Sequence, residues 1–233
     1  VDAAIHAHLV RPLPDRPGAC RFGHGLVRDA ILDAVTPPRR MALHRRVGLA
    51  LESTASGDRV RELADHFVEA APLGERDRAV QYSLEAAETA IRSLEYEAAS
   101  GRAARALELA SSAAERGALL LVIGRAGIDG GDSHEAHQAF LDAAEAARDA
   151  ADPLLFARAA LGATRGFRGG SEWMPEASGR ELLAEALGGL DRLDAVPDLG
   201  EADVLLRVEV LGRLALWTTD PEQRQASARL AMD

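Results

Sequence analysis

From about residue 58 onward, the sequence is a series of amphipathic helical segments separated by short turn signals, and this pattern limits the fold more than any other feature. Apolar residues recur at the three- and four-residue spacing of a helix face, and alanine, the best helix former, is frequent throughout. Clear stop and start signals are Gly130-Gly131-Asp132, Asp152-Pro153 and Asp220-Pro221, and the one long break is 166–176. The pattern predicts an all-α protein with helices at 59–71, 76–92, 95–110, 115–129, 133–150, 153–167, 176–194, 201–218 and 221–232.

Two neighbouring segments, within 117–150, carry small residues where a pair of helices would cross. Gly124 on the first segment and Ala136 on the second would let two antiparallel helices approach closely, while larger side chains fill the space between them. The pair resembles the tetratricopeptide repeat (TPR) at Leu120, Ile123, Gly124, Ala136, Phe140 and Ala143. It departs from that repeat at Gly127, where an aromatic residue is usual, and at Arg148, where proline is usual.

Other segments echo this pair less closely. Leu161-Gly162 and Leu211-Gly212 repeat the pattern of Ile123-Gly124, and residues 95–109 resemble another second helix. The resemblance implies a TPR-like α-solenoid over residues 57–233, in which antiparallel helix pairs stack into a superhelix with a concave face. A plain helical bundle is the alternative, because the intervals between the echoes exceed the period of the repeat, about 34 residues.

Residues 1–56 follow a different pattern. AAIHAHL (3–9) reads as the end of a helix, and the turn PDRPG between LVRPL and ACRFGH predicts a β-hairpin. A helical run over 22–35 follows, and then Thr36 and Pro37 supply an N-cap and a proline at the first position of a helix that reaches about Glu52. This order indicates the C-terminal part of a winged-helix domain with a junction helix.

The chemistry of the chain is limited by the absence of lysine, since all 27 basic residues are arginine. A P-loop and a Schiff base both need lysine, so both are excluded, and no G-x-S-x-G nucleophile motif occurs. HEAH (134–137) is one residue short of the H-E-x-x-H zinc motif. His134 and His137 would share a helix face, but a closed metal site needs further ligands, so a solvated helix start is the simpler interpretation. We therefore expect a non-enzymatic chain without catalytic residue, metal or cofactor.

The net charge of −10 argues against direct nucleic-acid binding, which depends on cationic surface. The charge is uneven, because eight arginines and four aspartates give residues 1–50 a charge of +4, which suits a contact with another domain. A single cysteine, Cys20, excludes an internal disulfide and fits a reducing, cytoplasmic compartment. No apolar run reaches the roughly 18 residues of a membrane span. The sequence begins at Val1 without methionine, so we expect a fragment of a longer protein.

The stretch 21–52, RFGHGLVRDAILDAVTPPRRMALHRRVGLALE, carries the most specific resemblance. It is similar to the junction in STAND-class bacterial regulators, where an ATPase module ends in a winged helix, through Phe22, His24, Leu26, Val27, Arg28, Ala30, Pro37, Arg39, Arg40, Leu43, His44 and Val47. ELADHFVEA (62–70) resembles the first helices after that junction. The resemblance implies an AAA-like ATPase module upstream in the same polypeptide, and a LuxR-type DNA-binding or a cyclase output domain elsewhere in it.

His24 and Arg28 lie four residues apart and would share one helix face. We expect this face to contact the ATPase module. The alternative is that His24 caps or packs at the corner between hairpin and helix, and that Arg28 forms a surface ion pair with Asp29 or Asp33.

The concave face is the expected binding surface, and the first helix of each pair would line it. The resemblance implies the groove positions Leu121, Arg125, Ile128, Phe156, Ala159, Phe167, Leu206, Glu209, Arg213 and Trp217. Arg125 and Arg213 would suit an acidic group. For Phe156, Phe167 and Trp217 the alternative is core packing, and Trp173 in the long break would either clamp a ligand or pack over a helix end.

These expectations lead to two functional hypotheses. The first is a regulatory sensor scaffold of an ATPase-coupled transcriptional regulator, which binds a small-molecule effector or a protein in the groove. The second is a freestanding TPR-type adaptor for proteins or peptides. A helical enzyme is disfavoured because the catalytic constellations are missing.

Overall fold

The computed structural model describes residues 2–14, 20–54, 59–165, 176–193 and 201–217. Within these residues the protein is mostly helical, with one two-stranded sheet, so the all-α prediction is confirmed. The helices are α1 (Asp2–His6), α2 (Gly25–Ala34), α3 (Pro37–Thr54), α4 (Val60–Ala70), α5 (Arg76–Arg92), α6 (Tyr96–Leu107), α7 (Ala113–Gly130), α8 (Ser133–Asp149), α9 (Pro153–Ala163), α10 (Glu176–Leu193) and α11 (Glu201–Trp217). A short 3₁₀ helix, η2 (Ala71–Leu73), extends α4. The helix expected at 221–232 lies outside the described residues.

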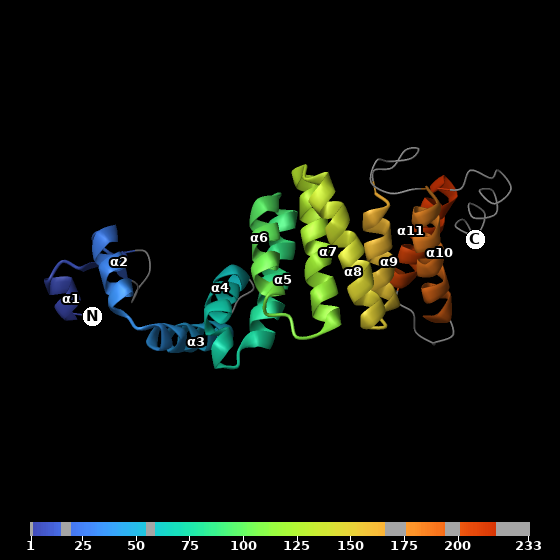
Figure 1. The fold of residues 1–233 in the computed structure, drawn as a ribbon. Coiled ribbons are helices and arrows are strands. Elements are labelled where there is room, and N and C mark those ends of the chain that lie inside the picture. Colours follow the sequence, from blue (N-terminus) through green and yellow to red (C-terminus); the bar gives the residue numbers. More distant parts are fainter. Residues whose placement is uncertain (1, 15–19, 55–58, 166–175, 194–200, 218–233) are drawn as a thin grey trace.

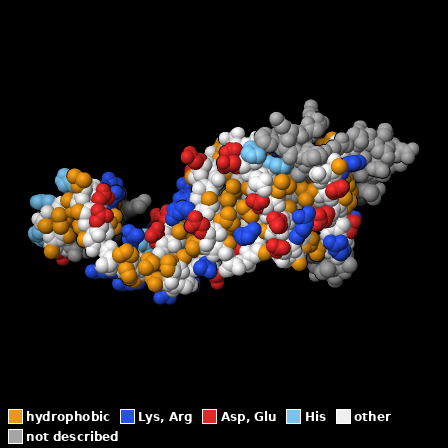
Figure 2. Space-filling model, in the orientation of Figure 1, with side chains coloured by type: hydrophobic (Ala, Val, Ile, Leu, Met, Phe, Trp, Pro, Cys, Tyr) orange, Lys and Arg blue, Asp and Glu red, His pale blue; other side chains and the backbone are white. Residues whose placement is uncertain are grey.

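The N-terminal elements form a small unit of their own. Strands β1 (Val10–Pro12) and β2 (Cys20–Phe22) pair antiparallel with Arg11 opposite Arg21, which confirms the predicted hairpin. No residue of α1 or α2 is buried. Figure 1 shows this unit apart from the other helices, at the end of α3, and Figure 2 shows hydrophobic side chains on its surface.

The helix ends follow from local capping chemistry. Ser112 and Glu115 form a reciprocal capping box at the start of α7. Asp152 accepts hydrogen bonds from the backbone N–H groups of Leu154 and Leu155, and Pro153 occupies the first position of α9. At the end of α7, Gly131 takes the left-handed conformation (φ 95°) that glycine adopts without strain.

Helices α4 to α11 stand side by side in an elongated row (Figure 1). Each helix packs against the next one in the chain, and alternate helices α5, α7, α9 and α11 also contact one another. Among the described residues, the backbones of α6, α8 and α10 lie farther from each other, although Arg148 of α8 forms an ion pair with Glu185 of α10. The helices of the α5–α11 series are therefore closer together than those of the other series, which hollows the molecule on their side.

Phe140 on α8 occupies the centre of the main core, with 1% of its surface exposed. Its ring lies against Gly124 on α7 and Gly162 on α9, where an added Cβ would overlap the ring atoms. The expected close approach of α7 and α8 is present, but Gly127 rather than Gly124 faces Ala136, with 2.8 Å from a built Cβ of Gly127 to the Cβ of Ala136. Gly124 instead leaves room for the ring that passes between α7 and α9.

Candidate binding groove

A cavity of about 1240 Å³ occupies the hollow side of the helical row. Its walls come from α5, α7, α9 and α11, with Phe140 of α8 and Val60 of α4 completing the lining. The residues from the four main helices and from the turn after α9 are Leu84, Glu85, Glu88, Thr89, Arg92, Ala118, Leu121, Val122, Arg125, Leu155, Arg158, Leu161, Gly162, Arg165, Leu206, Glu209, Gly212, Arg213 and Leu216. We call this cavity the groove.

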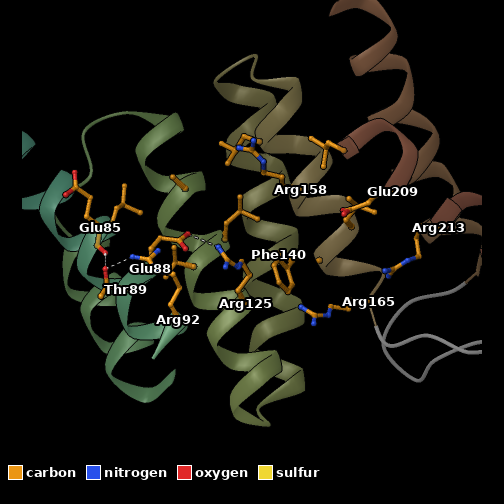
Figure 3. Close-up of a pocket in the computed structure, with 18 of the residues that line it drawn as sticks. Glu85, Glu88, Thr89, Arg92, Arg125, Phe140, Arg158, Arg165, Glu209 and Arg213 are labelled. Atoms are coloured by element: carbon orange, nitrogen blue, oxygen red, sulfur yellow. Dashed lines mark hydrogen bonds and ion pairs between the residues drawn. The ribbon is translucent and has the colours of Figure 1, made fainter. Parts of the chain in front are cut away.

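The groove combines an apolar floor with charged walls (Figure 3). Five arginines and three glutamates line it, although the chain as a whole carries a net charge of −10. On the α5–α7 side, Glu85 and Glu88 are matched in number by Arg92 and Arg125, whereas the α9–α11 side has Arg158, Arg165 and Arg213 with one glutamate, Glu209. The lining charges are therefore balanced on one side of the groove and mainly basic on the other.

At the α5–α7 side, the charged groups satisfy one another. Nη1 of Arg125 donates to Oε1 of Glu88 at 2.7 Å, which ties α7 to α5. Nη2 of Arg92 donates to the hydroxyl oxygen of Thr89 at 2.8 Å within α5. Arg125 thus has its charge balanced by a carboxylate of the same wall.

At the α9–α11 side, Arg213 is partly buried and held by the backbone. Its Nη1 donates to the carbonyl oxygen of Thr164 at 2.8 Å. Burial lowers the pKa of Arg213, the nearby Arg165 guanidinium lowers it further, and Glu209 opposes the shift. Nη2 of Arg165 lies 3.5 Å from Oδ1 of Asp129. Two guanidinium groups therefore share one region of the groove.

The sequence-predicted groove residues fall into three groups. Leu121, Arg125, Leu206, Glu209 and Arg213 all line the groove. Figure 3 shows Arg125, Glu209 and Arg213 directed toward the cavity from α7 and α11. Their role in binding stays a prediction.

Four other predicted groove residues do not line the cavity, and for these four the placement expected from the sequence is corrected. Phe156, Ala159 and Trp217 are core residues with 5%, 0% and 6% of their surface exposed, and Ile128 packs against the same core from its edge. Phe156 carries the Arg148 guanidinium 4.7 Å above its ring, which holds it among α8, α9 and α10. Phe167 and Trp173 lie outside the described residues.

Sequence reasoning missed the contribution of α5 and two arginines next to α9. Glu85, Glu88 and Arg92 line the groove because α5 is the first helix of the pair before α7. Arg158 on α9 and Arg165 just after it line the groove, whereas the sequence predicted Phe156 and Ala159 there. The spacing of Leu121 and Arg125, applied to each first helix in turn, would have found them.

The N-terminal candidates lie far from the groove. Nη2 of Arg28 forms an exposed ion pair with Oδ1 of Asp29 at 2.7 Å. His24 occupies the N-cap position of α2 by its backbone, and its side chain makes no capping hydrogen bond. Both residues are exposed in the described chain, and the predicted contact with an ATPase module stays a prediction.

Three further observations concern metal ligands, the histidines of α8 and membrane spans. Among the described residues, no three metal-ligating side chains come together. His137 on α8 is buried, and this burial lowers its pKa. His134, one turn earlier, is exposed. No helix in the described part of the chain has the length and apolarity needed to cross a membrane.

In comparisons with known proteins, no protein-family model, no curated protein and no solved structure matches the chain.

Proposed function

We propose that this chain is a non-catalytic, TPR-like binding scaffold that takes up an effector or a partner protein in the groove. The observation that carries the proposal is the groove of about 1240 Å³, lined by one face of each alternate helix from α5 to α11. Stacked helix pairs use such a hollow face for recognition. The mixture of an apolar floor with a few placed charges is the composition of a ligand site.

We further propose that the scaffold belongs to an ATPase-coupled transcriptional regulator of the STAND class, working in the cytoplasm. The junction-like stretch 21–52 supports this. So does the exposure of the N-terminal unit, where Leu26 has 85%, Ile31 40% and Leu32 45% of its surface exposed. Such an apolar surface suits contact with another module of the same polypeptide. An effector would act by binding unequally to two states of the regulator.

A freestanding adaptor of the TPR kind is the second candidate, and the same groove favours it. The two candidates differ in the native polypeptide. The regulator requires a P-loop ATPase module joined to the N-terminal unit, whereas the adaptor requires none. Sequencing the complete gene decides between them, and detection of an ATPase module rules out the adaptor.

Binding in the groove can be tested with a single residue that blocks it. Gly212 lines the groove on α11, and a Cβ built there meets no atom within 4 Å. Gly212→Trp should therefore fold and place its indole ring in the groove beside Arg213 and Leu216, where it blocks the α11 side. Gly101 on α6 is equally open and lies outside the groove, so Gly101→Trp is the matched control.

The experiment screens a library of metabolites and peptides for those that raise the midpoint of thermal unfolding of the wild-type chain. A groove ligand loses this effect with Gly212→Trp and keeps it with Gly101→Trp. Ligands that stabilise both variants equally bind elsewhere. If every ligand found in the screen behaves in this way, the groove is refuted as the binding site.

A further inference from the structure

The α9–α11 side of the groove holds three arginines and a single groove glutamate, Glu209. Within the described part of the chain, no carboxylate lies at ion-pair distance from Arg158 or Arg213. Arginine at the other side is different, because Arg125 is paired with Glu88 at 2.7 Å. The α9–α11 side of the groove therefore carries surplus positive charge, with Arg158 set apart from Arg165 and Arg213 (Figure 3).

Two of these arginines are placed to act together. Figure 3 shows Arg165 and Arg213 on the same side of the cavity, directed into it. Arg213 uses one guanidinium nitrogen on the carbonyl oxygen of Thr164, which fixes the side chain at the α9–α11 contact. The remaining guanidinium donors of Arg213 are available to a ligand.

Arg165 is only loosely engaged. Its contact with Asp129 is 3.5 Å long, whereas a strong charge-assisted hydrogen bond measures about 2.7–2.9 Å. Half of its side chain is exposed, at 52%. Like charges in one region repel each other, so an anion placed between the two guanidinium groups would relieve that repulsion.

We infer that the groove holds its ligand through an oxyanion group, a carboxylate or a phosphate, bound between Arg165 and Arg213. This inference rests on the proposed binding function of the groove. Arg158 adds positive potential from the same helix side, and Leu161, Leu206 and Leu216 provide an apolar surface next to the site for the rest of the ligand. Arg125 takes no part, because Glu88 already neutralises it.

The test observes the arginine side chains directly. The full chain is labelled with nitrogen isotope in arginine, and the Nε–H signals are followed by nuclear magnetic resonance during titration with pyrophosphate or with succinate at constant ionic strength. The signals of Arg165 and Arg213 should shift and saturate, while exposed Arg105 on α6 should show no saturable shift. The tighter of the two probes tells whether the site prefers phosphate or carboxylate.

Variants make the result specific. Arg165→Gln should weaken binding of the preferred probe by about tenfold, since one of two charge-assisted partners is lost. Arg165 is exposed and follows the end of α9, so this variant should keep the fold. Glu209→Gln should tighten binding a few-fold because it removes a carboxylate close to Arg213. Arg105→Gln is the matched control and should change nothing.

Equal affinity of the wild type and Arg165→Gln, or equal losses in Arg165→Gln and Arg105→Gln, would overturn the oxyanion site. The groove proposal fails in a different way. If a groove ligand is lost with Gly212→Trp but retained with Arg165→Gln and Arg213→Gln, the oxyanion site is wrong and the groove is right. If the ligand survives Gly212→Trp, the groove itself is wrong.

Discussion

The same change, glycine to alanine, should have opposite effects at two helical positions of this protein. At Gly162 on α9, a Cβ would overlap the Cγ, Cδ1 and Cε1 atoms of Phe140. At Gly212 on α11, a Cβ would meet nothing within 4 Å. Alanine is favoured over glycine inside a helix by about 1 kcal/mol, so Gly212→Ala should stabilise the chain by about that amount.

At Gly162 the same propensity gain of about 1 kcal/mol is opposed by overpacking. The ring of Phe140 is 1% exposed and contacts Gly124 on its other side, so it has little room to move. Overpacking typically costs about 1–3 kcal/mol, and this rigid site favours the upper end. Gly162→Ala should then destabilise by about 2 kcal/mol net, which lowers the unfolding midpoint by roughly 4–8 °C in a chain of this size.

A double-mutant cycle tests the cause. Phe140→Ala alone should cost about 3–5 kcal/mol, and in that background Gly162→Ala should become stabilising by about 1 kcal/mol because the ring is gone. The free energies are measured by urea unfolding followed by far-UV circular dichroism, with Gly212→Ala as the control. The reasoning is refuted if Gly162→Ala is as stabilising as Gly212→Ala, or if its penalty persists without Phe140.

Three further predictions concern stability. His44 and His66 place their Nδ1 atoms 3.1 Å apart between α3 and α4; burial and then the charge of His44 lower the pKa of His66. The folded state thus resists protonation of His66, so the free energy of unfolding should be highest above the ordinary pKa of 6.5 and should decrease as the pH falls below 6.5. His44→Gln should make this decrease smaller, as measured by urea unfolding at a series of pH values. The hydrogen bond from Arg45 at 2.6 Å is the main cause that lowers the pKa of buried Glu75. The ionised Glu75 therefore stabilises the fold above the ordinary pKa of 4.5, and this contribution is lost as the pH falls through the lowered pKa. Glu75→Gln should cost about 1–3 kcal/mol at neutral pH and should remove this part of the acid sensitivity. Ser112→Ala removes the capping box of α7 and should cost about 1 kcal/mol in thermal unfolding, and an unchanged midpoint would contradict the role of the cap.

Helix existence and many helix ends were predictable because they depend on local chemistry. Asp152-Pro153 and Gly131-Asp132 mark their boundaries through capping groups that act within one turn. The groove was predictable on α7 and α11 for a related reason: Leu121 and Arg125 lie one turn apart, so both share the face that a repeat of paired helices turns inward.

The same reasoning failed on α9 by one residue. Phe156 and Ala159 were expected in the groove, whereas Leu155 and Arg158 line it. A shift of one residue rotates a side chain by about 100° around a helix with 3.6 residues per turn, which carries it from the cavity wall into the core. The partners of the arginines were not predictable either. The neutralisation of Arg125 by Glu88 depends on how α5 and α7 pack against each other, because the two residues are 37 positions apart in the sequence.

The packing of the helical row is short-range in sequence, since its main contacts join elements one or two places apart. A chain of this kind closes small loops as it folds, so folding should be fast. It also allows the end helices to open while the α7–α8 centre stays intact, and amide hydrogen exchange should therefore slow from both ends toward the middle. A ligand that contacts α5 to α11 would oppose this opening along the whole row, so its binding should also slow amide exchange in helices that it does not contact.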